Sequence, residues 1–267
     1  MATVDAPAKT RAQIKERTFR TDNWRQYPYV TFVIFTAWVA YATVRAMWGS
    51  AFYVEQYHYL TPFYSPCVND ACGPAGEFGT FVPASAPFFI PYALISLPFL
   101  LGFRLTCYYY RKAYYRSFWA SPQACAVREP HGKYTGETRF PLIGQNLHRY
   151  FWIAAGLISL LNTWDAVRAF HGEDGGFGIG LGTIILWANV ILLWLYTLSC
   201  HSCRHAVGGR MKHFSKHPVR YKAWTLVSKL NTRHGTYALI TLGSLVVADF
   251  YVMLVASDTI SDLRIFN

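Results

Sequence analysis

Charged side chains are scarce in this sequence, and acidic ones are the scarcest. Only 15% of its 267 residues are Asp, Glu, Lys or Arg, and 14 residues are acidic. A soluble domain usually contains about 25% charged residues, so an ordinary globular fold is excluded. Disorder is excluded because 18% of the residues are aromatic. A nucleic-acid partner would suit the net charge of +11 but leaves the apolar runs unexplained, so the composition indicates a polytopic membrane protein.

Five apolar stretches are long enough to cross a bilayer, which takes about 20 helical residues. We therefore predict an all-α protein with five transmembrane helices, forming one membrane-anchor domain over residues 1–267. The first stretch is too long, and starts too far into the chain, to be a signal peptide. The predicted spans cover about 27–48, 87–107, 147–164, 178–200 and 237–256, after a basic tail over 1–26.

The basic residues lie almost entirely on one side of these spans. The tail and the loops after the second and fourth spans, with the adjoining span ends, hold 22 of the 25 Lys and Arg residues, and only Arg45, Arg168 and Arg264 fall on the other side. Loops rich in Lys and Arg stay in the cytoplasm. The predicted orientation thus has the N-terminus in the cytoplasm and the C-terminus outside, in a multi-pass protein of the plasma membrane.

The outer loop after the first span contains Cys67 and Cys72 in the segment SPCVNDAC. This loop faces an oxidising compartment, where paired cysteines form disulfides. We expect a disulfide between them that closes a short local loop.

The remaining cysteines and several histidines gather at the cytoplasmic ends of the spans. Ionisable and soft side chains are costly at membrane depth and often mark function there. One such residue alone is most often a small filler or a hydrogen-bonded ring, but four segments bring them to one depth. The set comprises Cys107, Cys125, His148, Cys200, His201, Cys203, His205 and His234.

Three kinds of metal centre fit this set of residues. Haem b needs two axial histidines from different helices, whereas mixed thiolates and imidazoles suit zinc or a Rieske-type two-iron cluster. His201 and His205 are four residues apart and would share one helix face. The sequence contains one CxxC pair without a second, and it lacks the C-x-H…C-x-x-H pattern of soluble Rieske domains.

Two further features bear on chemistry. The run YYYRKAYYRSFW after the second span fits an interfacial belt of aromatic and basic residues, and also a quinone site or a docking surface. Asp249 is an acid within the fifth span, which suggests proton uptake or helix pairing. Since no second acid accompanies it at mid-depth, an ion-transport path is poorly supported.

The motifs FRLTCYYYRKAYYRSFW…ACAV, NLHRYFW, SCHSCRHAVGGR and LN…H, in this order, resemble the five-helix membrane-anchor subunit of actinobacterial, including mycobacterial, succinate dehydrogenase. The form that they resemble is the one called type F of respiratory complex II. The resemblance implies flavoprotein and iron–sulfur subunits on the cytoplasmic face, and electron transfer to menaquinone or another quinone. A higher oligomer of the complex is compatible with the sequence.

The resemblance also implies an embedded Rieske-type 2Fe–2S cluster, where other complex II anchors carry haem b. We expect its ligands to be Cys107, Cys125, His201 and His205, with Cys200, His148 and His234 as alternates. Residue type and depth suggest quinone-binding side chains at Arg104, Trp119, Tyr150 and Arg204. A haem b anchor stays open as the alternative, since CHSCRH also resembles the H…RH stretch of haem-bearing anchors. A structural membrane anchor or a transporter with a zinc site is a further alternative.

Overall fold

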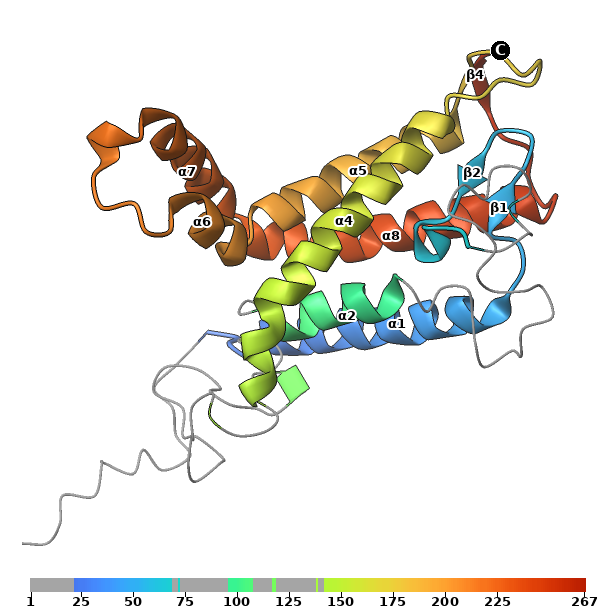
Figure 1. Cartoon of the computed structure of the whole chain (residues 1–267). Helices are drawn as coiled ribbons and strands as arrows, with labels where there is room; N and C mark the ends of the chain where they lie inside the picture. The colour runs from blue at the N-terminus through green and yellow to red at the C-terminus, as the bar shows by residue number, and fades with distance from the viewer. Residues whose placement is uncertain (1–21, 69–71, 73–95, 108–116, 119–137, 139–141) are drawn as a thin grey trace, which may run out of the picture.

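A computed structural model describes residues 22–68, 72, 96–107, 117–118, 138 and 142–267. Within these ranges the chain is mostly helical (Figure 1). The α-helices are α1 Gln26–Trp48, α2 Leu97–Thr106, α4 His148–Arg168, α5 Leu181–Leu198, α6 His201–Gly208, α7 Pro218–Asn231 and α8 His234–Ala256. Short 3₁₀ turns cover Pro62–Tyr64, Leu142–Leu147 and Phe214–Lys216, and short strands are β1 Tyr53–Val54, β2 Tyr59–Leu60, β3 Ile179–Gly180 and β4 Arg264–Phe266.

Three of the described helices are long and apolar enough to span a membrane, namely α1, α5 and α8. Their mean hydropathies are 1.5, 1.9 and 2.1 over 18-residue windows. Helix α4 has 21 residues but is more polar, and α2 is a shorter apolar helix of 10 residues. The first part of the predicted second span, 87–95, lies outside the described residues. Each predicted span overlaps one described helix, although Ile179–Gly180 at the start of the fourth span forms strand β3.

The helices pack through apolar faces and are joined by a few polar contacts. Helix α5 lies between α4 and α8 (Figure 1). Trp194 Nε1 donates to Thr163 Oγ1 on α4 at 2.9 Å, and Ser244 Oγ on α8 donates to Asn189 Oδ1 on α5 at 2.8 Å. Such bonds satisfy polar groups that lipid cannot.

Asp249 of α8 pairs with Arg45 of α1. Arg45 donates to both carboxylate oxygens, at 2.7 and 3.1 Å, and the two side chains are 2% and 0% exposed. Tyr41 and Thr61 donate the remaining bonds, each at 2.5 Å. The intramembrane acid therefore joins two helices and the loop after α1, as the helix-pairing interpretation of the sequence expects.

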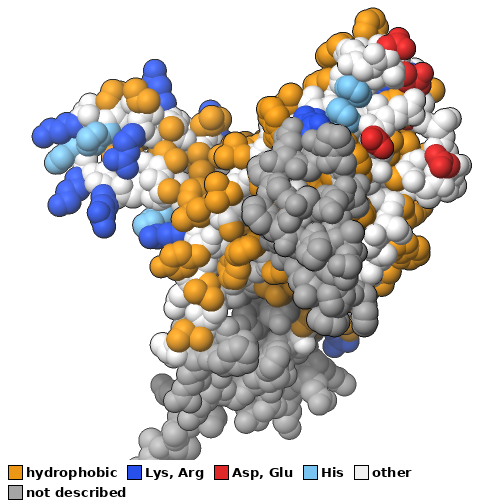
Figure 2. Space-filling model, turned by 45° about the vertical axis from the view of Figure 1, so that its right-hand side comes forward, with side chains coloured by type: hydrophobic (Ala, Val, Ile, Leu, Met, Phe, Trp, Pro, Cys, Tyr) orange, Lys and Arg blue, Asp and Glu red, His pale blue; other side chains and the backbone are white. Residues whose placement is uncertain are grey.

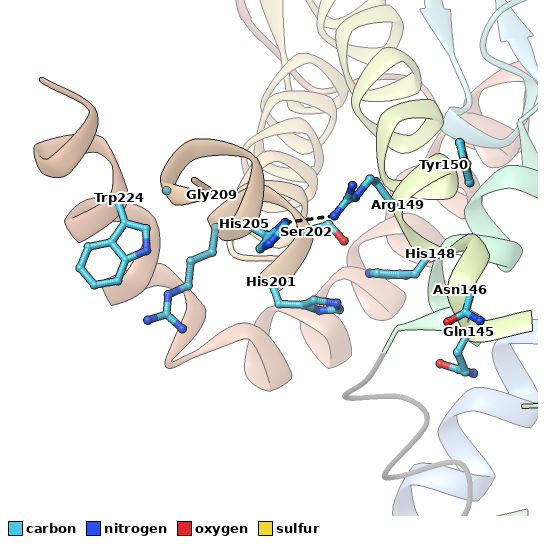
Figure 3. Close-up of a pocket in the computed structure, with 12 residues that line it drawn as sticks. Gln145, Asn146, His148, Arg149, Tyr150, His201, Ser202, His205, Gly209 and Trp224 are labelled. Atoms are coloured by element: carbon cyan, nitrogen blue, oxygen red, sulfur yellow. Dashed lines mark hydrogen bonds between the residues drawn. The ribbon is translucent and has the colours of Figure 1, made fainter. Parts of the chain in front are cut away.

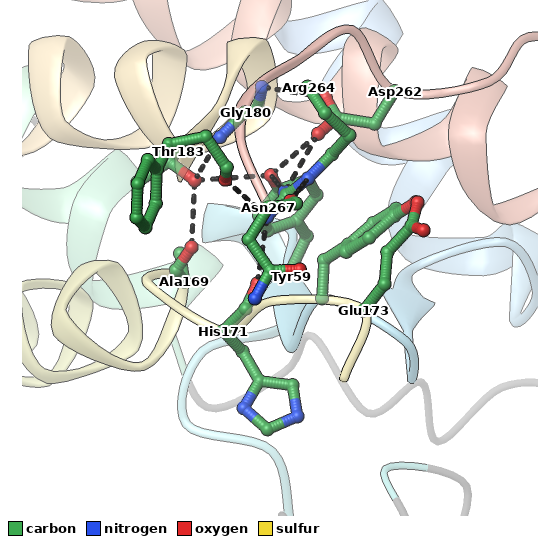
Figure 4. A network of polar contacts seen from close by, with 12 residues as sticks. Tyr59, Ala169, His171, Glu173, Gly180, Thr183, Asp262, Arg264 and Asn267 are labelled. Atoms are coloured by element: carbon green, nitrogen blue, oxygen red, sulfur yellow. Dashed lines mark hydrogen bonds and ion pairs between the residues drawn. The ribbon is translucent and has the colours of Figure 1, made fainter. Parts of the chain in front are cut away.

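Two small antiparallel sheets, β1–β2 and β3–β4, close one end of the bundle. The expected disulfide between Cys67 and Cys72 is present there, with Cα atoms 6.4 Å apart. Asp262 accepts hydrogen bonds from Tyr59, Tyr251 and the backbone N–H of Gly182, and it pairs with Arg264 at 3.2 Å (Figure 4). Burial and the adjacent carboxylate raise the pKa of Tyr59 to about 12. This network fastens the segment after α8 to the start of α5.

At the other end, α6 and α7 form an arm that projects from the bundle (Figure 1). Blue Lys and Arg side chains gather on this arm in Figure 2, while red acidic side chains appear at the opposite end of the visible surface. The charges of the described residues are therefore segregated along the bundle, as the sequence predicts.

Candidate functional site

Two thiols and two imidazoles meet at helix ends near the base of the arm. Cys107 follows the last residue of α2, His148 begins α4, Cys200 precedes α6 and His234 begins α8. The Cys107 Sγ and His234 Nε2 atoms are 3.2 Å apart, and the His148 Nε2 and Cys200 Sγ atoms are 3.1 Å apart. All four side chains are buried. We call them the thiol–imidazole cluster.

Each imidazole of the cluster is oriented by a hydroxyl group on its other nitrogen. His148 Nδ1 lies 2.9 Å from Thr106 Oγ1, and His234 Nδ1 lies 2.7 Å from Ser199 Oγ. Both rings therefore present Nε2 to a thiol. Histidines that bind metals usually have such a partner on the nitrogen that does not bind the metal, because it fixes the ring orientation.

An aromatic ring stacks on the face of each of the two histidine rings. The His148 ring stacks on Phe103, and the His234 ring stacks on Tyr196, with centroids 5.1 and 5.0 Å apart. Phe103 and Tyr196 also contact each other at 5.1 Å. The cluster is thus built on helix ends and packed aromatic rings.

A third imidazole, His201, lies at the edge of the cluster. Its ring stacks on that of His148 at 5.0 Å, and its Nδ1 is 4.0 Å from Cys200 Sγ. One ligand atom from each of His148, Cys200 and His201 lies within 4.8 Å of the other two. Burial and the neighbouring His205 lower the pKa of His201, so its neutral, metal-binding form is favoured.

Only some of the predicted metal ligands belong to the thiol–imidazole cluster. Cys107 is in it, and so are the three alternates Cys200, His148 and His234, whereas Cys125 lies outside the described residues. His205 instead receives a hydrogen bond on Nδ1 from Arg149, at 3.0 Å. Two hydroxyl residues, Thr106 and Ser199, directly precede the two cluster cysteines in the sequence and were a signal that sequence reasoning missed.

An open pocket of about 650 Å³ adjoins the cluster between the start of α4 and the arm (Figure 3). His148 and His201 line it from the cluster side, and Arg149 and His205 line it farther out. Arg204 and Trp224 close it along α6 and α7, with the guanidinium 5.1 Å from the indole ring. The pocket is therefore basic, partly aromatic and in contact with the imidazoles.

Two of the four predicted quinone-binding residues, Tyr150 and Arg204, line this pocket. Arg104 lies elsewhere, buried between α2 and α8, where it donates to the backbone oxygen of Ala238 and to Thr241 Oγ1, both at 3.0 Å. Its guanidinium lies 4.9 Å from the Tyr196 ring. Trp119 is outside the described residues.

Comparison with known proteins agrees with the resemblance found in the motifs. Residues 26–258 match the family model described as actinobacterial succinate dehydrogenase subunit SdhC. The chain is also 68% identical to a chain in the structure of the Mycobacterium smegmatis Sdh1 complex in the apo form, with a TM-score of 0.90. That alignment covers 97% of this chain and 98% of the other. No curated protein matches the chain by sequence.

Proposed function

Since the chain belongs to the family of the actinobacterial succinate dehydrogenase subunit SdhC, we propose that it anchors that enzyme in the plasma membrane and passes its electrons to a quinone. Its partners are the flavoprotein and iron–sulfur subunits, which oxidise succinate. The chain supplies the last part of the path, from the iron–sulfur subunit to menaquinone.

The proposed topology has five spans, with the N-terminus and the arm on the cytoplasmic side and the C-terminus outside. Helices α2 and α4 serve as spans beside α1, α5 and α8. The segregation of charge supports this orientation, because the arm is basic and the opposite end carries acidic residues (Figure 2). The partner subunits then meet the face on which the thiol–imidazole cluster lies.

The thiol–imidazole cluster fits a Rieske-type 2Fe–2S cluster by the chemistry of its donors. Such a group takes two thiolates and two imidazoles. Cys107, Cys200, His148 and His234 would supply those donors, and they lie as two buried Cys–His pairs with Sγ and Nε2 atoms 3.2 and 3.1 Å apart. When bound, it would carry one electron at a time at a potential raised by imidazole ligation. Burial excludes water from these four residues, and Thr106 and Ser199 orient the rings.

The geometry favours thiolate and imidazole ligation over a haem. A haem b would be held by two imidazoles and no thiolate, yet each Nε2 in the cluster lies 3.1–3.2 Å from a thiol. For the same reason, the pair His148 and His234 is favoured over His201 and His205.

The pocket is the proposed quinone site, and one observation carries this assignment. His148 belongs both to the thiol–imidazole cluster and to the pocket wall, so a quinone in the pocket would lie directly beside the cluster. Tyr150, Arg149 and Arg204 line the pocket, and their O–H and N–H groups are the proposed hydrogen-bond donors to quinone oxygens. An apolar quinone tail would leave through the open side of the pocket.

The test uses the purified complete complex reduced with dithionite. Low-temperature EPR should give a Rieske-like signal with a low average g value, and metal analysis should find two irons and acid-labile sulfide beyond the clusters of the other subunits. Cys200→Ala and His234→Ala should each remove this signal and quinone reduction, while succinate oxidation by soluble artificial acceptors continues. Cys203→Ala, at a buried cysteine outside the thiol–imidazole cluster, is the matched control.

Other outcomes would contradict the proposal. Sharp haem α-bands that disappear in His234→Ala would identify a haem b anchor. Stoichiometric zinc without sulfide would identify a structural zinc site. Quinone reduction that survives both substitutions would exclude these residues from the electron path.

A further inference from the structure

Helix α7 carries an apolar stripe that no other part of the described chain covers. Val219 is 79% exposed and Leu226 is 60% exposed. Ala223 is also exposed, and Leu230 is partly exposed. These four residues recur at spacings of four, three and four, so they share one face of the helix.

The opposite face of α7 is fixed against α6. Val227 is buried, Ser228 Oγ accepts from Arg204 Nε at 3.0 Å, and the Arg204 guanidinium lies 5.1 Å from the Trp224 ring. The Trp224 ring also stacks on Phe214 at 6.1 Å. These contacts fix the orientation of α7, so its apolar stripe faces away from α6.

Basic residues border the stripe on one flank. Lys222 and Lys229 are exposed and seven residues apart, which places both beside the stripe on the same side of the helix. Arg233, just beyond the end of α7, is exposed too. Figure 2 shows blue side chains concentrated on the arm. A partner that covers the apolar stripe of α7 and its basic flank must therefore carry both apolar surface and negative charge.

The chain holds the arm close to the bilayer at both of its ends. Helix α6 begins three residues after α5 ends at Leu198, and α7 ends at Asn231, three residues before α8 begins. Both α5 and α8 are apolar enough to span a membrane. Helix α7, of 14 residues, is therefore held near a span at its C-terminal end, while α6 holds the other end of the arm near α5.

We propose that α7 is an interfacial helix seated on anionic phospholipid. Its apolar stripe lies among the acyl chains, and Lys222 and Lys229 bind the phosphates of the head groups. An exposed apolar face bordered by Lys is the pattern of helices that lie in the bilayer interface, and Lys near an anionic surface strengthens the attachment.

The test measures the surroundings of the stripe in the complete complex, reconstituted in bilayers that contain phosphatidylglycerol. A nitroxide label on Leu226→Cys should collide freely with oxygen and be shielded from a water-soluble nickel chelate. A label on Thr225→Cys, about 100° around the same helix, is the matched control and should collide more with the chelate. The unsubstituted complex gives the background from its native cysteines.

Two results would overturn the lipid assignment. Free access of the chelate to the label at position 226 would place the stripe in water. A strongly immobilised label that neither reagent reaches would mean that another protein subunit covers it.

Lipid charge is tested separately. The label at position 226 should lie deeper in bilayers with phosphatidylglycerol than in pure phosphatidylcholine, and Lys222→Gln with Lys229→Gln should abolish that difference. Equal depth in the two bilayers with both lysines present would overturn the role of anionic head groups.

Discussion

At the scale of single residues, hydroxyl groups determine how the two cluster histidines point. Thr106 and Ser199 occupy the Nδ1 atoms of His148 and His234, which leaves each Nε2 directed at a thiol. Without these bonds the rings could rotate, because stacking on Phe103 and Tyr196 fixes the ring planes but not the positions of the nitrogens.

Removing a hydroxyl should therefore weaken the site without removing a ligand. We expect Thr106→Val or Ser199→Ala to reduce the occupancy of the metal centre or the rate of quinone reduction by about 10–100-fold. The measurement is EPR signal per complex together with the rate of succinate-to-quinone electron transfer. Ser159→Ala is the control, because Ser159 on α4 bonds only its own helix, at Ala155 O. A normal signal and rate in both variants would mean that the hydroxyls do not orient the rings.

The buried pair of Arg45 and Asp249 gives a second prediction at this scale. Asp249→Ala leaves a buried guanidinium without its carboxylate, so the stability of the complex should fall by about 3–5 kcal/mol. Thermal unfolding of the purified complex measures this change. Asp258→Asn, at an exposed acid, should leave the melting temperature unchanged.

A double variant separates charge from packing at the same position. Replacing both partners, with Arg45→Met and Asp249→Leu, should recover most of the lost stability, because no unpaired charge remains. Failure to recover would show that the bonds from Tyr41 and Thr61 matter more than the ion pair.

At the scale of elements, close helix packing positions the cluster. Helices α2 and α4 carry Cys107 and His148 at their ends, and they approach closely at Gly102. A Cβ atom added there would come within 2.5 Å of the Phe151 ring. The absence of a side chain at Gly102 thus permits the approach of these two helices.

Adding one methyl group at this contact should separate the helices. We expect Gly102→Ala to cost about 1–3 kcal/mol of stability through overpacking and to reduce the metal content of the complex. Gly156→Ala on α4 is the matched control, since a Cβ there meets nothing within 4 Å. Equal metal content and melting temperature in the two variants would show that Phe151 simply moves aside.

The elements also show what the sequence can and cannot predict. The first span was predicted at 27–48, and helix α1 covers 26–48. The agreement is close because the bounds of a long apolar helix follow from the hydropathy of its own residues. The predicted ligand pair His201 and His205 rested on a regular helical spacing. The structure places both histidines on helix α6, but this helix begins only at His201, because the backbone of Cys200 is extended. The extended backbone directs Cys200 to His148, a contact that no local pattern encodes.

At the scale of the whole molecule, two polar ends are attached to an apolar bundle. The end with β1 to β4 is closed by Asp262, which binds two tyrosines, a backbone N–H and Arg264 (Figure 4). The opposite end carries the thiol–imidazole cluster and the arm. Composition and charge segregation were sufficient to predict this organisation, whereas the side-chain network at Asp262 depends on residues up to 203 positions apart.

Disrupting the Asp262 network should loosen one end and spare the other. Asp262→Ala removes the acceptor of the Tyr251 hydroxyl and of the Gly182 N–H, at about 1–3 kcal/mol for each unsatisfied buried group. Tyr59 and Arg264 keep other partners, at Thr183 Oγ1 and Asn267 O. We expect faster proteolysis of the segment after α8 from the proposed outer side, with the EPR signal of the proposed metal centre unchanged. Asp174→Ala, at an exposed acid, should not change the cleavage rate. Loss of the EPR signal in Asp262→Ala would show instead that the two ends unfold together.

The placement of the thiol–imidazole cluster has a consequence for biogenesis. Cys107 and His234 are 127 residues apart, and His234 begins the last span. A ribosome-bound chain that stops before α8 therefore lacks one imidazole and the helix that positions it. If the four residues hold the proposed metal centre, that centre can be completed only after α8 has entered the bilayer, and we expect chains truncated before α8 to lack it.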